Sequence, residues 1–251
     1  MKPLSNRIAL VTGASRGIGR AVSYNLAEAG AHIIAVARSA ESLNALSEEI
    51  HKEGGSCTPC PMDLSDENAI IRLKDMISRK WGRLDILIGN AGLLGEIAPL
   101  PNIASDIWSQ TMQINVTANF YLLKHLDPLL QKSDAGRIVF ITSGAAYKCS
   151  PAWGIYSVSK SALEALAKTY ANENKDNQVK VMLLSPGPIR TDMRAKAAPD
   201  EDPMTLRTPQ DLVPHILKMV LPQWTETGKI YDFPAGGIIK EPGIPYVKVS
   251  E

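Results

Sequence analysis

Two side chains that can move a proton lie one helical turn apart near the middle of the chain. Tyr156 and Lys160 have the i, i+4 spacing that places two side chains on one face of a helix. A free tyrosine has a pKa near roughly 10, so at neutral pH it transfers protons slowly. A neighbouring ammonium favours the phenolate and lowers that pKa. The pair suits acid–base chemistry at a carbonyl or alcohol, although the same spacing is common on helices that have no such role.

Two further polar residues can complete such a site. Ser143 ends the strand expected over Gly136–Ser143, 13 residues before Tyr156, and can donate to a carbonyl oxygen as negative charge develops there. Asn115 lies in the middle of a helical pattern that runs from Trp108 to Lys124. Asparagine is unfavourable inside helices because its side chain competes for backbone hydrogen bonds. It is therefore either a functional residue or a polar residue used in packing.

A glycine-rich turn near the N-terminus predicts a dinucleotide site. The turn Thr12–Gly19 lies between the apolar run Ile8–Val11 and a helical pattern over Ala21–Ala29. Backbone N–H groups at a helix N-terminus bind a pyrophosphate in this geometry. We expect one glycine to permit the sharp turn, one to let the phosphates approach and one to let the helix pack on the strand. The candidate cofactor residues of the turn are Gly13, Ser15, Arg16, Gly17, Ile18 and Gly19.

The end of the second expected strand, His32–Ala37, indicates which cofactor is used. An acidic residue at this position binds the 2′-hydroxyl of NAD, whereas an arginine accommodates the 2′-phosphate of NADP. The chain has Arg38 here, and Arg16 can add a second positive charge. The sequence therefore favours NADP(H) over NAD(H). In the alternative, Arg38 only extends into solvent from the end of a strand.

Two more strand ends contribute candidate residues. The strand expected over Cys57–Met62 contains Pro59 and Pro61, so we expect it at an edge of the sheet. Asp63 and Leu64 follow it, where Asp63 either accepts from the adenine amino group or caps a helix. A strand ending at Gly89 leads into Asn90, Ala91 and Gly92, whose small side chains allow the backbone to lie against a ribose.

Strands alternate with helices along all 251 residues, and no repeat or low-complexity linker interrupts them. With 45% hydrophobic residues the chain can bury a large core. We predict an α/β fold, a single-domain Rossmann fold over residues 1–251, with a doubly wound parallel sheet of about seven strands flanked by helices.

Taken together, these motifs resemble the classical short-chain dehydrogenases/reductases in order and spacing. They are the TGASRGIG turn, Asn90–Gly92, Asn115, Ser143, the Tyr156/Lys160 pair and Pro186-Gly187. The resemblance covers roughly residues 5–230, and the glycine turn is similar to that of 3-oxoacyl-acyl-carrier-protein reductases.

The resemblance implies a role for each matched residue. Tyr156 would be the general acid/base, and Lys160 would lower its pKa and bind the nicotinamide ribose. Ser143 would orient the substrate carbonyl, and Asn115 would hold a water that links Lys160 to a proton relay. The segment against the nicotinamide would comprise Pro186, Gly187, Ile189 and Thr191.

The chain also departs from the family pattern. Gly89 stands where the family usually has a first asparagine, and Tyr231–Pro234 stands where Val-Asp-Gly-Gly usually closes the last strand. Residues 234–251 are therefore expected to form a C-terminal extension. In the family this region packs across one subunit interface, and the helices that carry Asn115 and Tyr156 pair across another two-fold axis. The resemblance therefore implies a homodimer through those helices or a homotetramer, with the dimer the firmer expectation.

The expected function is hydride transfer between NADPH and a carbonyl or alcohol. An apolar pocket lined by Leu93, Leu94, Trp153 and Met193 favours an aliphatic or aromatic carbonyl, and a 3-oxoacyl thioester on acyl carrier protein is one candidate. Residues 192–208 would form a mobile substrate lid. The alternative is a catalytically silent NADP-binding sensor or scaffold.

Composition argues against several other classes of protein. A net charge of +1 with no basic block gives no indication of a nucleic-acid partner. We find no signal peptide or apolar stretch of membrane length, and so expect a cytoplasmic protein. Cys57 and Cys60 have the spacing of a redox or metal pair, but no second pair completes a zinc site. We predict plain thiols and no metal.

Overall fold

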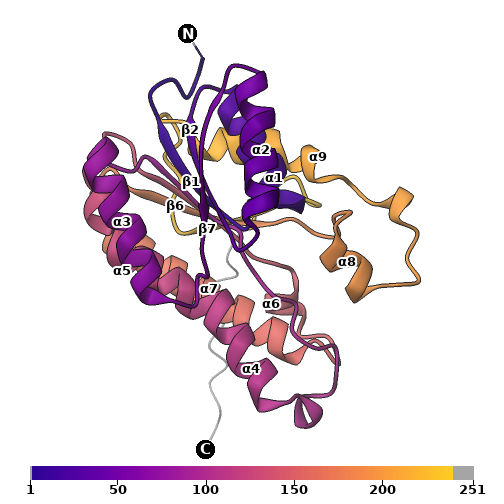
Figure 1. Ribbon diagram of the computed structural model, residues 1–251. Helices are drawn as coiled ribbons and strands as arrows, with labels where there is room; N and C mark the ends of the chain where they lie inside the picture. Colours follow the sequence, from indigo (N-terminus) through magenta and orange to yellow (C-terminus); the bar gives the residue numbers. More distant parts are fainter. Residues whose placement is uncertain (1, 240–251) are drawn as a thin grey trace, which may run out of the picture.

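The computed structural model describes residues 2–239, in which one eight-stranded sheet lies between two layers of helices (Figure 1). The strand order is β3-β2-β1-β4-β5-β6-β7-β8, and all neighbours are parallel except β7 and β8. The predicted doubly wound sheet is confirmed, with a short antiparallel strand added at one edge. The strands are β1 Ile8–Thr12, β2 His32–Ala37, β3 Ser56–Pro61, β4 Ile86–Gly89, β5 Arg137–Ile141, β6 Lys180–Ser185, β7 Lys229–Asp232 and β8 Gly237–Ile238.

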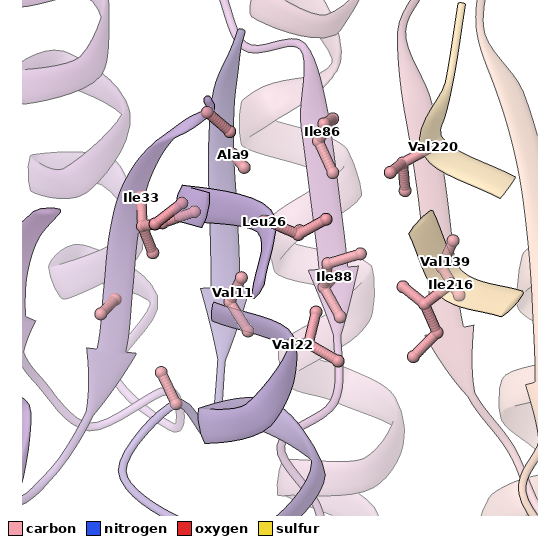
Figure 2. Close-up of a cluster of buried hydrophobic side chains, with 14 of the residues drawn as sticks. Ala9, Val11, Val22, Leu26, Ile33, Ile86, Ile88, Val139, Ile216 and Val220 are labelled. Carbon is pink, nitrogen blue, oxygen red and sulfur yellow. The ribbon is translucent and has the colours of Figure 1, made fainter. Parts of the chain in front are cut away.

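The helices cover both faces of the sheet and divide the core into two clusters. One cluster lies under α1 Gly17–Glu28, α2 Ala40–Lys52 and α9 Pro209–Val220. Figure 2 shows part of it, where Val22 and Leu26 of α1 and Ile216 of α9 face the strands. The other cluster lies under α3 Glu67–Trp81, α5 Ala118–Leu130 and α7 Gly154–Glu173. The shorter helices are α4 Ser105–Met112, α6 Ala145–Lys148 and α8 Asp192–Ala197.

Strand β3 lies at the edge of the sheet, as its prolines predict. Cys57 packs into the core cluster under α1 and α2, whereas Cys60 packs against the cluster on the opposite face. Both are free thiols, and burial raises the pKa of Cys57 to about 11. The strand therefore separates the two sulfurs across the sheet, and the prediction of plain thiols agrees with this arrangement.

The helix expected over Trp108–Lys124 is divided in the structure. Helix α4 ends at Met112, a π-helical turn spans Gln113–Thr117, and α5 continues to Leu130. The π-turn contains Asn115, the residue whose type conflicts with a regular helix, and such turns often occur at functional sites. The helix continues beyond Lys124 because α5 buries a run of leucines, and this packing outweighs the presence of Pro128.

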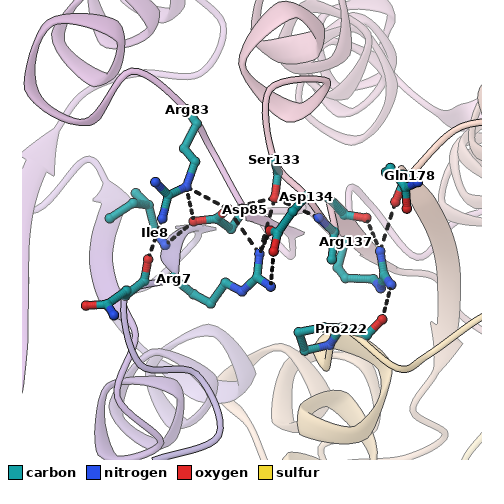
Figure 3. A network of polar contacts seen from close by, with 12 residues as sticks. Arg7, Ile8, Arg83, Asp85, Ser133, Asp134, Arg137, Gln178 and Pro222 are labelled. Atoms are coloured by element: carbon teal, nitrogen blue, oxygen red, sulfur yellow. Dashed lines mark hydrogen bonds and ion pairs between the residues drawn. The ribbon is translucent and has the colours of Figure 1, made fainter.

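A buried polar network fixes the N-terminal ends of β1, β4 and β5, at the end of the sheet away from the strand carboxyl ends (Figure 3). The carboxylate of Asp85, which is fully buried, accepts from the Ile8 backbone N–H at 2.8 Å and from Ser133 Oγ at 2.6 Å. Arg7 and Arg83 approach the same carboxylate at 3.3 and 3.1 Å. Each oxygen of the buried charge is thus paired.

No helix within residues 2–239 is both long and apolar enough to span a bilayer. Nor does this part of the chain gather three or more histidine, cysteine or acidic side chains in a group that could hold a metal ion.

Candidate active site

A cavity of about 760 Å³ opens where the parallel strands end, and it collects most of the residues predicted from the sequence. This is the place where open α/β sheets bind ligands, outside the carboxyl ends of the strands. Among the candidate site residues, only Gly19 and Asn115 do not line it. The candidates that do line it are Gly13, Ser15, Arg16, Gly17, Ile18, Arg38, Asp63, Leu64, Asn90, Ala91, Gly92, Ser143, Tyr156, Lys160, Pro186, Gly187, Ile189 and Thr191.

The glycine turn leads directly into the N-terminus of α1. Gly13 and Gly17 have φ of +65° and +55°, which favour glycine. A Cβ added at Gly19 would lie 2.3 Å from the Gly13 carbonyl oxygen, so only glycine allows helix and turn to approach this closely. No side chain caps the start of α1, whereas Ser39 accepts from the Ser42 N–H at the start of α2. The first N–H groups of α1 are therefore available to the diphosphate of a dinucleotide.

The loop after β4 is fastened to the turn after β1. Asn90 Nδ2 donates to the Thr12 carbonyl at 2.9 Å, and Thr12 Oγ1 accepts from the backbone N–H groups of Asn90 and Ala91 at 2.9 and 3.0 Å. A side chain at Gly89 would meet the Phe140 ring, with the nearest carbon 2.2 Å from an added Cβ. The departure from the family asparagine is thus matched by Phe140, and Thr12 and Asn90 hold the loop instead.

The residues expected at the adenosine end of the cavity have other contacts in the structure. Arg38 is exposed at the end of β2. Arg16 pairs with Asp192 at 3.2 Å, both side chains being largely exposed. Asp63 Oδ1 accepts from both the N–H and the hydroxyl of Ser65 at 2.8 Å, and these hydrogen bonds lower the pKa of Asp63. Asp63 therefore stabilises the turn before α3 while it lines the cavity.

Tyr156 and Lys160 lie together on the inner face of α7. The Lys160 ammonium is 5.6 Å from the centre of the Tyr156 ring and donates to the Ile141 carbonyl at 2.8 Å. Tyr156 is 9% exposed, and its hydroxyl lies 4.0 Å from the Met193 sulfur of α8. The end of β5 and the start of α8 thus enclose the two side chains.

Burial controls the protonation of this pair. It raises the pKa of Tyr156 to about 12, against the opposing effect of a hydrogen bond with Ser143. It lowers the pKa of Lys160 to about 8, against the opposing effect of the Glu164 charge. The lowered tyrosine pKa expected from the neighbouring ammonium is therefore not found, because desolvation of the phenolate dominates. At neutral pH, Tyr156 carries its proton and can act as a proton donor.

Asn115 is completely buried and ties three segments together. Its Nδ2 donates to the Leu93 carbonyl at 2.8 Å and to Ser159 Oγ at 2.9 Å, and its Oδ1 accepts from the Leu93 N–H at 2.7 Å. A Cβ added at Gly92 would lie 3.3 Å from Asn115 Oδ1 and 3.6 Å from Lys160 Nζ. The side chain therefore supports the loop that separates it from the lysine.

The segment 192–208, expected as a lid, contains the six-residue helix α8 and a 3₁₀ turn at Pro203–Thr205, neither of which buries a residue. Its ends are joined by the Arg190 N–H, which donates to the Arg207 carbonyl at 2.8 Å. Arg194 and Glu201 form an ion pair of 2.5 Å across it. The movement of this segment stays a prediction.

The sequence reasoning assigned no role to Thr12, Ile141, Thr142 or Glu164, all of which contact the site. A signal for Glu164 was present, since it continues the i, i+4 series of Tyr156 and Lys160. The contact of Ile141 is made through a backbone carbonyl, which side-chain type cannot reveal.

Comparison with known proteins agrees with this geometry. The family model of short chain dehydrogenases matches residues 7–202. The chain is 38% identical to the Escherichia coli K12 protein "Uncharacterized oxidoreductase YciK", over 96% of each chain. It is 33% identical to human "Dehydrogenase/reductase SDR family member 4", over 75% of this chain and 68% of that one.

Solved structures give the same result. A short chain dehydrogenase from Shigella flexneri 2a, complexed with NADP, superimposes with a TM-score of 0.89 at 38% identity, over 92% of this chain and 98% of that one. A second from Escherichia coli CFT073, complexed with NADPH, gives 0.88 at 37% identity over the same shares. The chain belongs to the short-chain dehydrogenase/reductase family, and it is an oxidoreductase that acts on CH–OH or C=O groups.

Proposed function

We propose that this enzyme reduces a carbonyl compound with NADPH. The observation that carries the proposal is the buried, protonated Tyr156 beside Lys160 in a cavity that also holds the uncapped N-terminus of α1. The NADP and NADPH bound by the two similar structures support the choice of cofactor. A bound NADPH supplies the hydride, and the residues of this chain orient the reactants and provide the proton.

The four polar residues of the site have different tasks in this proposal. Ser143 donates to the substrate oxygen as negative charge builds on it, which lowers the barrier. Tyr156 then gives its proton to the same oxygen. The Lys160 ammonium holds the nicotinamide ribose hydroxyls and offsets negative charge near the phenol. Asn115 fixes the loop against which the ribose lies and holds the water of the proton relay.

The other residues that line the cavity would bind the remaining parts of the cofactor. The turn Gly13–Gly19 would hold the diphosphate, Asp63 and Leu64 would lie by the adenine, and Asn90–Gly92 would contact the ribose. Pro186, Gly187, Ile189 and Thr191, which line the same cavity, would hold the nicotinamide.

Replacing Arg38 with Asp should weaken NADPH binding by about 10- to 100-fold, because a charged hydrogen bond to the 2′-phosphate is lost and repulsion replaces it. NADH, which lacks this phosphate, should lose little. Fluorescence titration with each cofactor measures both constants. Arg79→Asp, an exposed arginine of α3 outside the cavity, is the control. An equal loss for NADPH and NADH would show that Arg38 does not bind the phosphate.

The substrate is best sought with a panel of carbonyls that includes acetoacetyl thioesters, quinones and simple aldehydes. Leu93, Leu94, Trp153 and Met193 line the cavity, so we propose an aliphatic or aromatic carbonyl, and among these a 3-oxoacyl thioester. Loss of NADPH absorbance with any member supports the proposal. Tight NADPH binding with no turnover across the panel would support the alternative, a silent NADP-binding sensor or scaffold in the cytoplasm.

We also propose that two copies associate through helices α4, α5 and α7, with a tetramer as the higher state. Trp108, Phe120 and Val158, one on each of these helices, expose 37%, 46% and 40% of their surface. Exposed large apolar side chains favour burial against a partner. The same helices carry or adjoin Asn115 and Tyr156, so association would also brace the site.

Phe120→Glu should convert the dimer into a monomer, because burying a carboxylate in an apolar contact is unfavourable. Light scattering after size-exclusion chromatography reports the mass. Met204→Glu, at an exposed residue of the segment 192–208, is the matched control and should not change it. A wild-type protein that is already monomeric at micromolar concentration would contradict the proposal.

A further inference from the structure

Ile141, which ends β5, and the two residues that follow it each contact a residue of α7, which gives three rungs. Ser143 hydrogen-bonds with Tyr156. The Ile141 carbonyl accepts from Lys160 Nζ at 2.8 Å. Thr142, which lies between Ile141 and Ser143 in the sequence, donates from its Oγ1 to Glu164 Oε1 at 2.7 Å. Two of the rungs involve residues of the proposed reaction, and the third has no assigned role.

The third rung places a carboxylate within the electrostatic reach of the buried lysine. Lys160 is 4% exposed, and its Nζ donates to a neutral carbonyl oxygen, which does not balance its charge. Glu164 follows it by one turn of α7 and is the acidic group whose charge acts on Lys160. Leaving a buried ammonium without an opposite charge is costly, so a nearby carboxylate stabilises the charged form.

We propose that Glu164 is the counter-ion of Lys160 and that Thr142, by holding the Glu164 carboxylate, makes the pair a positioning device for the reaction. The proposal rests on the proposed function, since it assigns a second layer of residues to the same site. Glu164 does not line the cavity and acts through Lys160; Thr142 lines the cavity, but its hydroxyl is engaged by Glu164, so it acts through Glu164.

Burial and the neighbouring groups act on the ionisation of the Glu164 carboxylate in opposite senses, and its pKa is raised on balance. Burial raises the pKa of Glu164, whereas the Thr142 hydrogen bond and the charges of Lys168 and Lys160 lower it. From α6, Tyr147 also faces this carboxylate, and its hydroxyl donates to Asp232 of β7 at 3.3 Å. The Thr142 hydrogen bond lowers the pKa of Glu164 more than either lysine does. Loss of this hydrogen bond should therefore neutralise the carboxylate most readily.

Glu164→Gln tests the proposal because it removes the charge and keeps the shape and the acceptor for Thr142. Without the carboxylate the pKa of Lys160 falls further, so the ammonium is lost at lower pH. The dissociation constant of NADPH, titrated from pH 6 to 10 by fluorescence, should show its alkaline weakening about one pH unit earlier than in the wild type. Thr142→Val should give a smaller shift in the same direction, and Thr142→Ser should restore the wild-type profile.

The control is Glu173→Gln, the same substitution at an exposed residue of α7, which should leave the profile unchanged. The double variant Glu164→Gln/Thr142→Val should shift no further than Glu164→Gln alone, because the threonine acts through the charge. Circular dichroism confirms that each variant is folded.

An unchanged NADPH profile in folded Glu164→Gln would overturn the inference, because Lys160 would then not depend on that charge. A shift in Glu164→Gln with an additive effect of Thr142→Val would overturn the part assigned to Thr142. Failure of the proposed function has a different signature, namely full carbonyl reduction by Tyr156→Phe.

Discussion

Replacing Tyr156 with Phe is expected to slow carbonyl reduction by about 10³-fold, which corresponds to about 4 kcal/mol in the barrier. The substitution removes only the hydroxyl that donates the proton. The centre of its ring stays 5.6 Å from Lys160 Nζ and 6.1 Å from the centre of the Trp153 ring, so the cavity keeps its shape. Stopped-flow or steady-state oxidation of NADPH with an accepted carbonyl measures the rate.

NADPH binding separates loss of chemistry from loss of the site. Tyr156→Phe should bind NADPH within a few-fold of the wild type, because the glycine turn and Arg38 are untouched. Tyr170→Phe, on the same helix and outside the cavity, removes a hydroxyl that donates to Asp127 at 2.6 Å. This control should lower stability and leave kcat unchanged. Turnover by Tyr156→Phe within about tenfold of the wild type would show that the proton comes from another group.

The protonation states of the pair give reduction and oxidation different expected pH dependences. With the pKa of Tyr156 near about 12, the phenol is protonated at neutral pH and ready to donate, which reduction requires. Oxidation of an alcohol needs the phenolate, whose formation burial opposes. With the pKa of Lys160 near about 8, the ammonium is present below that pH and lost above it. Reduction is therefore expected to decline on the alkaline side of about pH 8, and oxidation to need a higher pH than reduction.

The sequence predicted the parts of the site that motifs and strand ends determine. The doubly wound parallel sheet, the edge position of β3 with Pro59 and Pro61, and the gathering of cavity residues follow from periodicity and from the geometry of parallel sheets. The glycine turn could be interpreted because a larger residue would clash at its tight positions. A Cβ at Gly19, for example, would clash with the Gly13 carbonyl oxygen.

What the sequence could not predict depends on distances between segments. The pKa of Tyr156 was expected to fall because Lys160 is near in sequence, but the depth of burial was unknown and decides the sign. The π-turn at Asn115 and the short helix α6 are each about one turn long, so they leave no periodic pattern of residues in the sequence. The Thr142–Glu164 contact joins residues on different elements, so only the packing of α7 on β5 reveals it.

Asp85→Ala is expected to lower the free energy of unfolding by about 3–5 kcal/mol, which is a fall in Tm on the order of 10 °C for a chain of this size. The substitution leaves Arg7, the Ile8 N–H and Ser133 without the carboxylate they share at the buried end of β1. Unpaired buried groups, and not the lost attraction itself, make up most of this cost. Urea titration and calorimetry measure it.

Two variants show whether burial is the reason. Asp134→Ala removes another carboxylate that pairs with Arg7, but Asp134 is 78% exposed, so the loss should stay below about 1 kcal/mol. Asp85→Asn keeps an acceptor and should cost less than Asp85→Ala. A change below about 1 kcal/mol in Asp85→Ala would mean that water or a rearranged arginine replaces the carboxylate.

The Asp85 and Tyr156 variants should also affect stability and activity in opposite ways. The Asp85 network lies at the N-terminal ends of the strands, and the cavity lies at their carboxyl ends. Below its lowered Tm, Asp85→Ala should therefore keep its kcat, whereas Tyr156→Phe should keep its Tm and lose its kcat. Loss of kcat in folded Asp85→Ala would mean that the close-packed sheet transmits strain from one of its ends to the other.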